Sequence, residues 1–248
     1  MITITGIDNI PEIERGDDIG LLICEAAKKQ ELEIDSSDVL VVTHKIVSKS
    51  EGRIVNVEQV VPSPFAEQVS KNSDKDPRHV EIVLNESKRI VRMWKNHLIT
   101  ENKLGLVCAN AAIDRSNISQ KNHVALLPED PDSSARKIRN KIKELTGSEV
   151  AVIISDTFGR PWRSGQVNIA VGISGMIAFK DYRGKEDSFG HLMSVTNIAI
   201  ADELASAAEL VMNKVDRVPV AIIKGYEYPK GEGNSKDMIR PSHADIFI

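Results

Sequence analysis

The chain has 248 residues, 41% of them hydrophobic and 27% charged, which is the ordinary balance of a globular protein. Its formal net charge of −4 mixes both signs along the chain and argues against sequence-independent nucleic-acid binding, which needs a basic face. The start MITITGIDNI lacks the parts of a signal peptide, and no apolar run approaches the roughly 20 residues of a spanning helix. We therefore expect a cytoplasmic protein that binds neither nucleic acid nor membranes.

Four apolar segments rich in β-branched residues predict buried strands. In chain order they are Val39–Val42, Leu104–Ala109, Val150–Ile154 and Val218–Ile223. Pro219 interrupts the last segment, and because proline cannot donate a ladder hydrogen bond, it predicts that the strand begins there.

Three amphipathic patterns predict helices. Their apolar positions are Val80, Val83, Leu84, Ile90 and Val91; Ala135, Ile138, Ile142 and Leu145; and Ile200, Leu204, Ala208 and Val211. Ser133 or Ser134 can cap the second helix, and Gly147 can end it. Because strands and helices do not alternate strictly, we predict an α+β fold of mixed β-sheets with packed helices.

Several common catalytic motifs are absent from the sequence. It has no GxxxxGK[ST] phosphate loop, no GxGxxG dinucleotide motif, no HExxH zinc motif and no GxSxG nucleophile motif. The only two cysteines, Cys24 and Cys108, lie in apolar stretches, which indicates buried thiols rather than a disulfide or a metal site. Common hydrolase and oxidoreductase templates therefore do not fit.

Two aspartates stand where a predicted strand ends. Asp114 follows the run LVCANAAI, and Asp156 follows VAVIIS with Thr157 directly after it. A carboxylate at a strand end is rigidly placed at a sheet edge, and such hard oxygen ligands suit Mg²⁺ or Mn²⁺ bound to phosphates. The alternative is that each aspartate caps the following turn or helix.

Basic residues gather in THKIVSKSEGR, directly after the predicted strand that ends at Val42. Lys45 and Lys49 can neutralise phosphate oxygens there, and Ser48 and Gly52 let backbone amides approach them. The alternative is a pair of solvated lysines in a loop. In DTFGRPWRSG, Trp162 could stack on an aromatic ring, although a place in the core is the more ordinary one.

Segments that span most of the chain resemble the coenzyme F420-0:gamma-glutamyl ligase family. They are IPEIERGDDI, DVLVVTHKIVSKSEGR, NAAIDRSNI, VIISDTFGRPWRSGQVNIAVGISG and ADELASAAELVM, and they run in the family's order. The resemblance implies a single ligase domain over residues 1–248, with a family-specific α+β fold assembled as an intertwined homodimer.

The same resemblance implies a reaction. Members of this family use GTP, two divalent ions (Mg²⁺ or Mn²⁺) and K⁺ to attach L-glutamate to coenzyme F420-0. The first amide engages the lactyl carboxylate and the second is a gamma-linkage to the first glutamate. An acyl phosphate is the expected intermediate, because phosphoryl transfer activates the carboxylate toward the amine.

The family's motifs also imply roles for individual residues. Nucleotide contacts fall on Ile10, Pro11, Glu12, Ile13, His44, Lys45, Lys49, Asn117, Met212, Asn213, Lys214, Val215, Asp216, Arg217 and Val218. Metal ligands fall on Asp114, Asp156 and Thr157, and the expected catalytic residues are Asp114, Asp156 and Lys49.

One segment departs from the family pattern. Where some members carry an oxygen ligand for the second metal, this chain has Lys214, so either Asp216 replaces that ligand or water and phosphate hold the ion. Two other functions stay open beside the ligase. One is a metal-dependent phosphohydrolase that uses the same aspartates, and the other is a catalytically silent nucleotide-binding module.

Overall fold

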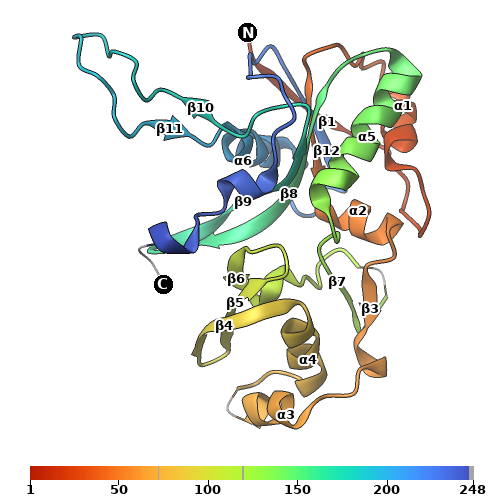
Figure 1. The fold of residues 1–248 in the computed structure, drawn as a ribbon. Helices are drawn as coiled ribbons and strands as arrows, with labels where there is room; N and C mark the ends of the chain where they lie inside the picture. The colour runs from red at the N-terminus through yellow and green to blue at the C-terminus, as the bar shows by residue number, and fades with distance from the viewer. Residues whose placement is uncertain (72, 119, 246–248) are drawn as a thin grey trace.

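The computed structural model describes residues 1–71, 73–118 and 120–245, and a mixed five-stranded sheet lies at its centre (Figure 1). The strands in spatial order are β1 (Thr3–Ile7), β12 (Val220–Lys224), β2 (Val39–Thr43), β8 (Ala151–Arg160) and β9 (Arg163–Ser174). Only β2 and β8 pair in parallel, and the other neighbours are antiparallel.

Helices cover both faces of this sheet. Leu40 and Val42 of β2 pack on the face that carries α1 (Ile19–Lys29) and α5 (Pro131–Thr146). Val39 and Val41 pack on the opposite face, against α6 (Ile200–Met212). Alternate residues of β2 therefore face two different cores, and this explains why the strand is apolar throughout. The predicted strand at 39–42 and the predicted helix from Ile200 are confirmed.

The part of the chain that follows α2 (His44–Ser50) and precedes α5 forms a second group of elements. This group lies beneath the sheet in Figure 1. It contains β3 (Ile54–Asn56), α3 (Pro64–Lys71), α4 (Pro77–Asn85), β4 (Ser87–Trp94), β5 (His97–Asn102), β6 (Val107–Ala109) and β7 (His123–Ala125). β3 pairs with β7, and β4, β5 and β6 form a three-stranded sheet. Val80, Val83 and Leu98 form a small core of their own in this group.

Two predicted elements in this group were wrong in extent. The apolar pattern from Val80 was extended to Ile90 and Val91, but α4 ends at Asn85 and the last two residues lie on β4, paired with β5. The helical spacing of the apolar residues continues by chance beyond the end of α4 and into β4. The strand predicted over Leu104–Ala109 is only the three-residue β6, because Gly105 (φ 93°) donates to the Asn102 carbonyl in a tight turn.

The ends of α5 follow its capping chemistry. Its N-cap is Asp130, whose carboxylate accepts from the Ser133 amide at 3.0 Å, so the predicted serine cap was wrong by one turn. Pro131 occupies the first turn, where its missing amide proton costs no hydrogen bond. Gly147 ends the helix in a left-handed conformation (φ 77°), as predicted.

A long arm leaves the sheet after β9. The short strands β10 (Lys180–Asp181) and β11 (Asn197–Ile198) pair at its base, and the chain between them projects away from the body (Figure 1). The α+β prediction with mixed sheets is confirmed, whereas the dimer and a fold particular to the family stay predictions. In the part of the chain described, no helix combines the length and apolar composition needed to cross a membrane.

Candidate active site

The site forms where β2 ends and α2 begins. β2 and β8 pair in parallel up to Thr43 and Ser155, after which α2 starts at His44 while β8 continues to Arg160. Asp156 is therefore the first residue of β8 without a β2 neighbour. The prediction that a strand ends at Asp156 was wrong, because the neighbouring strand ends there instead. The exposed edge that this creates is where the polar side chains gather.

His44 and Asp156 face each other below the surface. The His44 Nε2 and Asp156 Oδ1 atoms are 3.3 Å apart, with the side chains 0% and 7% exposed, but they are not aligned for a hydrogen bond. Asp156 Oδ1 also accepts from the Thr157 amide at 2.6 Å. His44 Nδ1 lies 3.3 Å from the Ser48 hydroxyl one turn further along α2. The Asp156 carboxylate is thus fixed by the Thr157 amide and has the His44 ring close to the same oxygen.

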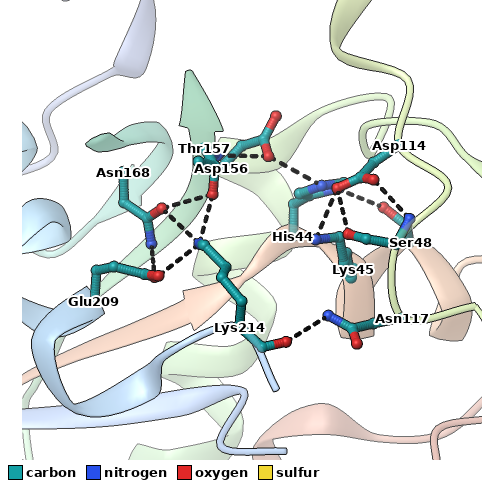
Figure 2. A network of polar contacts seen from close by, with 11 residues as sticks. His44, Lys45, Ser48, Asp114, Asn117, Asp156, Thr157, Asn168, Glu209 and Lys214 are labelled. Carbon is teal, nitrogen blue, oxygen red and sulfur yellow. Dashed lines mark hydrogen bonds and ion pairs between the residues drawn. The ribbon is translucent and has the colours of Figure 1, made fainter. Parts of the chain in front are cut away.

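Asp114 reaches the same place from the second group of elements. Its carboxylate accepts from Lys45 Nζ at 2.8 Å, from the Ser116 amide at 2.7 Å and from the Ser116 hydroxyl at 2.9 Å. Burial alone raises the pKa of Asp114, but the Lys45 and Ser116 bonds outweigh it and hold the pKa below its ordinary value. Asp114 and Asp156 therefore contact the adjacent residues Lys45 and His44 of α2 (Figure 2).

A turn with strained backbone angles places Asp114 at the site. β6 ends at Ala109, and the next three residues, Asn110 to Ala112, all have left-handed φ values of 51°, 54° and 63°. That conformation costs roughly 1–2 kcal/mol for each non-glycine residue, and such strain collects at functional sites. The expectation that Asp114 directly follows a strand was wrong. Nothing in the alanine-rich sequence signals a left-handed turn.

A second cluster surrounds the ammonium group of Lys214 (Figure 2). Lys214 Nζ donates to Thr157 Oγ1 at 2.7 Å and to Asn168 Oδ1 at 3.2 Å, and it pairs with Glu209 Oε1 at 2.7 Å. Asn168 and Glu209 were missed from the sequence. Asn168 lies on β9 and Glu209 on α6, each among several other polar residues, and no spacing motif marks either of them.

Two of the other predicted nucleotide residues contact Glu12. Its carboxylate pairs with Lys49 of α2 and, at 3.2 Å, with Arg217. Asn117 Nδ2 donates to the Lys214 carbonyl at 3.2 Å. The segments 10–13, 44–49, 114–117 and 212–218 are thus brought together, although their roles toward a nucleotide stay predictions.

Some of the predicted nucleotide residues are apolar and pack in the core. Ile13 is buried in the core beside α1, and Ile10 packs against that core. Met212 is the last residue of α6 and is buried, whereas Val215 is exposed. The apolar residues of these segments can therefore serve a polar ligand only through their backbone. Asp216, the alternative ligand for a second metal, accepts instead from Asn213 Nδ2 at 2.8 Å.

The two expected cation positions fit the structure differently. Asp114 and Asp156 offer hard carboxylate oxygens on either side of the first turn of α2, and these suit a divalent ion that also binds phosphate oxygens. The oxygen of Thr157 already faces an ammonium group. In the described residues, no group of three or more His, Cys, Asp or Glu side chains is arranged to hold a metal by itself. A phosphate ligand would have to complete the coordination shell.

The structure also tests the expectations for the two cysteines and for Trp162. Both cysteines are free and partly buried; burial raises the pKa of Cys24 to about 11 and that of Cys108 to about 12, so each is a thiol. The nearby Asp156 carboxylate adds to the rise in the Cys108 pKa, which favours the thiol over the thiolate. Trp162 lies at the tip of the β8–β9 hairpin and is 79% exposed, so its expected place in the core was wrong.

Comparison with known proteins identifies the family. The model of the F420-0:gamma-glutamyl ligase family matches residues 8–225. The chain is 46% identical to the coenzyme F420:L-glutamate ligase of Methanocaldococcus jannaschii over 215 residues, which is 86% of both chains. It is 42% identical over 249 residues to the ligase of that name from Methanothermobacter thermautotrophicus, covering 99% of this chain and 98% of the relative. For the Methanopyrus kandleri ligase the identity is 43% over 241 residues, with 95% and 93% covered. This chain belongs to the F420-0:gamma-glutamyl ligase family.

Proposed function

We propose that the chain is a GTP-dependent ligase that joins L-glutamate to coenzyme F420-0. The observation that carries the proposal is the placement of Asp114 and Asp156 against the consecutive residues Lys45 and His44, at the exposed end of β2. Carboxylates interleaved with cations suit a triphosphate bound together with a divalent ion. The relatives are named as coenzyme F420:L-glutamate ligases, which supplies the acceptor and the amine.

The proposed chemistry has two displacements. A carboxylate oxygen of coenzyme F420-0 attacks the γ-phosphorus of GTP, the bond to the bridging oxygen breaks, and GDP leaves. The amine of glutamate then attacks the acyl carbon of the resulting acyl phosphate, phosphate leaves, and the nitrogen loses a proton. The amine of the first glutamate is joined to the lactyl carboxylate, and the amine of the second is joined to the gamma-carboxylate of the first. Positioning and charge neutralisation supply most of the rate enhancement in such transfers.

The chain's own residues divide this work. Lys45 and Lys49 line one side of α2 and would release Asp114 and Glu12 to bind phosphate oxygens instead. The Thr157 amide orients Asp156, and the buried His44 ring lies 3.3 Å from the same carboxylate oxygen. Mg²⁺ or Mn²⁺ held by Asp114 and Asp156 would neutralise charge on the transferring phosphoryl group. K⁺ belongs to the proposal only through the resemblance to the family.

One experiment separates this ligase from its two alternatives. The protein is incubated with GTP, Mn²⁺ and coenzyme F420-0, with and without L-glutamate, while phosphate is measured and products are weighed by mass spectrometry. A ligase releases phosphate in step with a glutamylated product, and only when both co-substrates are present. Equal phosphate release without coenzyme F420-0 and glutamate indicates a phosphohydrolase. GTP binding without phosphate release or product indicates a silent nucleotide-binding module.

Replacing Lys49 with methionine is expected to weaken GTP binding by about 10–100-fold. A hydrogen bond between charged groups contributes about 1.5–3 kcal/mol, and methionine keeps most of the apolar stem of Lys49, whose side chain is 14% exposed. Isothermal titration calorimetry with a non-hydrolysable GTP analogue measures the change. Lys29→Met, at the exposed end of α1, is the matched control and should bind as the unaltered protein does. If Lys49→Met binds the GTP analogue with unchanged affinity, Lys49 does not contact the nucleotide.

We also propose that the chain assembles as a homodimer through its arm. Three apolar side chains on the arm, Phe189, Leu192 and Val195, are 86%, 69% and 84% exposed. Large apolar groups gathered on one projecting segment are typical of a surface that a partner covers. The arm projects away from the body after β9 (Figure 1), and in the proposed dimer a second copy covers these side chains.

Serine at these three arm positions is therefore expected to shift the protein from dimer to monomer. The triple variant loses roughly 2 kcal/mol of apolar burial at each position in each subunit, which is enough to weaken a dimer by several orders of magnitude. Size-exclusion chromatography with light scattering gives the mass in solution. Val61→Ser, equally exposed but distant from the arm, should leave the mass unchanged. A dimer that persists in the triple variant would show that another surface holds it.

A further inference from the structure

The ammonium group of Lys214 occupies a site built from three separate elements. Thr157 comes from β8, Asn168 from β9 and Glu209 from α6, and each directs a side-chain oxygen to Lys214 Nζ at 2.7, 3.2 and 2.7 Å respectively. Such a set of hard oxygens around one positive charge resembles the surroundings of a bound cation more than an ordinary surface ion pair.

The oxygens of this site are held in place independently of the lysine. Asn168 is 3% exposed, and its Nδ2 donates to Glu209 Oε2 at 2.7 Å. The Thr157 hydroxyl donates to Asn168 Oδ1 at 2.7 Å. These bonds direct Asn168 Oδ1 and the Glu209 carboxylate toward the point where the ammonium lies (Figure 2). Lys214 itself is half exposed and reaches in from the segment that follows α6.

The position of the site relative to Asp156 gives it a role. Thr157 is the next residue after Asp156 on β8, so the Lys214 ammonium is bonded to the strand one residue away from the carboxylate proposed to hold a divalent ion. The same lysine is linked to the Asp114 segment, because its carbonyl accepts from Asn117 Nδ2. A positive charge fixed at this place can face a phosphate group that binds between the two segments.

We propose that Lys214 is a tethered cation, which fills the position of a second divalent ion beside Thr157. This inference rests on the proposed function, in which a nucleotide and one divalent ion bind at Asp114 and Asp156. The chain then binds one divalent ion for each nucleotide, and the lysine supplies the second positive charge. Thr157, Asn168 and Glu209 hold the ammonium instead of a metal.

Counting bound Mn²⁺ tests the proposal without measuring activity. Electron paramagnetic resonance of free Mn²⁺ gives the number of ions bound per chain in the presence of a saturating non-hydrolysable GTP analogue. We expect one nucleotide-dependent Mn²⁺ in the unaltered protein and two in Lys214→Gln. Glutamine has a similar reach but no charge, and its amide oxygen can join Thr157 and Glu209 around a metal.

Two further measurements distinguish this role from a merely structural one. Lys143→Gln removes a lysine that pairs with Glu149 on the distant end of α5, and it should still bind one Mn²⁺. If Lys214 only ties its segment to the sheet, Lys214→Gln lowers the melting temperature and leaves the Mn²⁺ count at one, which overturns the proposal. Two ions in the unaltered protein overturn it as well. If neither protein binds Mn²⁺ but both bind the nucleotide, the proposed metal site at Asp114 and Asp156 fails, and the tethered cation fails with it.

Discussion

Asp156→Asn is expected to lower glutamate-ligase turnover by on the order of 10³-fold while the protein stays folded. Asparagine has the shape of aspartate and can still accept from the Thr157 amide, so the contacts that fix this position survive. What is lost is the negative charge beside His44, at the place where the divalent ion is proposed to bind. Removing one preorganised electrostatic contact from a transition state costs about 10²–10³-fold, and loss of a bound ion adds to this.

A buried aspartate elsewhere in the protein provides the control. Asp202, in the first turn of α6, accepts from the Ala170 amide at 2.8 Å, and burial raises its pKa above the ordinary value. Asp202→Asn keeps that acceptor and should leave turnover within about threefold of the unaltered enzyme, a difference below 1 kcal/mol. Turnover is measured at saturating GTP, coenzyme F420-0 and glutamate, and circular dichroism checks the fold. Full turnover in Asp156→Asn would show that the Asp156 carboxylate has no role in the reaction.

The polar residues of the site could be predicted from the sequence better than the backbone that presents them. Asp114, Asp156 and Lys45 were selected because each follows an apolar segment, and the structure brings them together at the first turn of α2. The prediction placed both aspartates at strand ends, however. A local apolar pattern tells where a strand is buried, but not which of two paired strands stops first, because that depends on the partner's register.

The Lys214 cluster marks a second limit of sequence reasoning. Lys214 was noticed only as a departure from a family pattern, and its partners Asn168 and Glu209 were not predicted at all. Glu209 lies on a helix whose spacing predicts a core face, so a polar residue beside that face resembles an ordinary surface position. Asn168 lies on β9, over which no element was predicted. Only the packing of α6 against β9 shows that the two side chains point at one another and at the lysine.

Gly172→Ala is expected to destabilise the protein by about 3 kcal/mol, the upper end of the range for overpacked cores. A Cβ atom at this position of β9 would lie 2.5 Å from the carbonyl carbon of Pro131 and 2.6 Å from its oxygen. The glycine is therefore required for close approach and not for its backbone freedom. The first turn of α5 cannot easily retreat, because the Asp132 carboxylate accepts from the Ile173 amide at 2.7 Å and from the Ser235 amide at 3.2 Å. Relief of the clash would break these buried bonds.

Urea denaturation measures this effect, and Gly159→Ala is its matched control. Gly159 lies on the neighbouring strand β8, and a Cβ atom there would meet nothing within 4 Å. Alanine at Gly159 should change the free energy of unfolding by less than about 1 kcal/mol, whereas Gly172→Ala should lower the midpoint without changing the slope of the transition. Equal stability of the two variants would mean that α5 can shift away from the sheet at no cost. The Asp132 bonds to β9 would then contribute little to holding the helix, although they close the sheet face on which Leu40 and Val42 are buried.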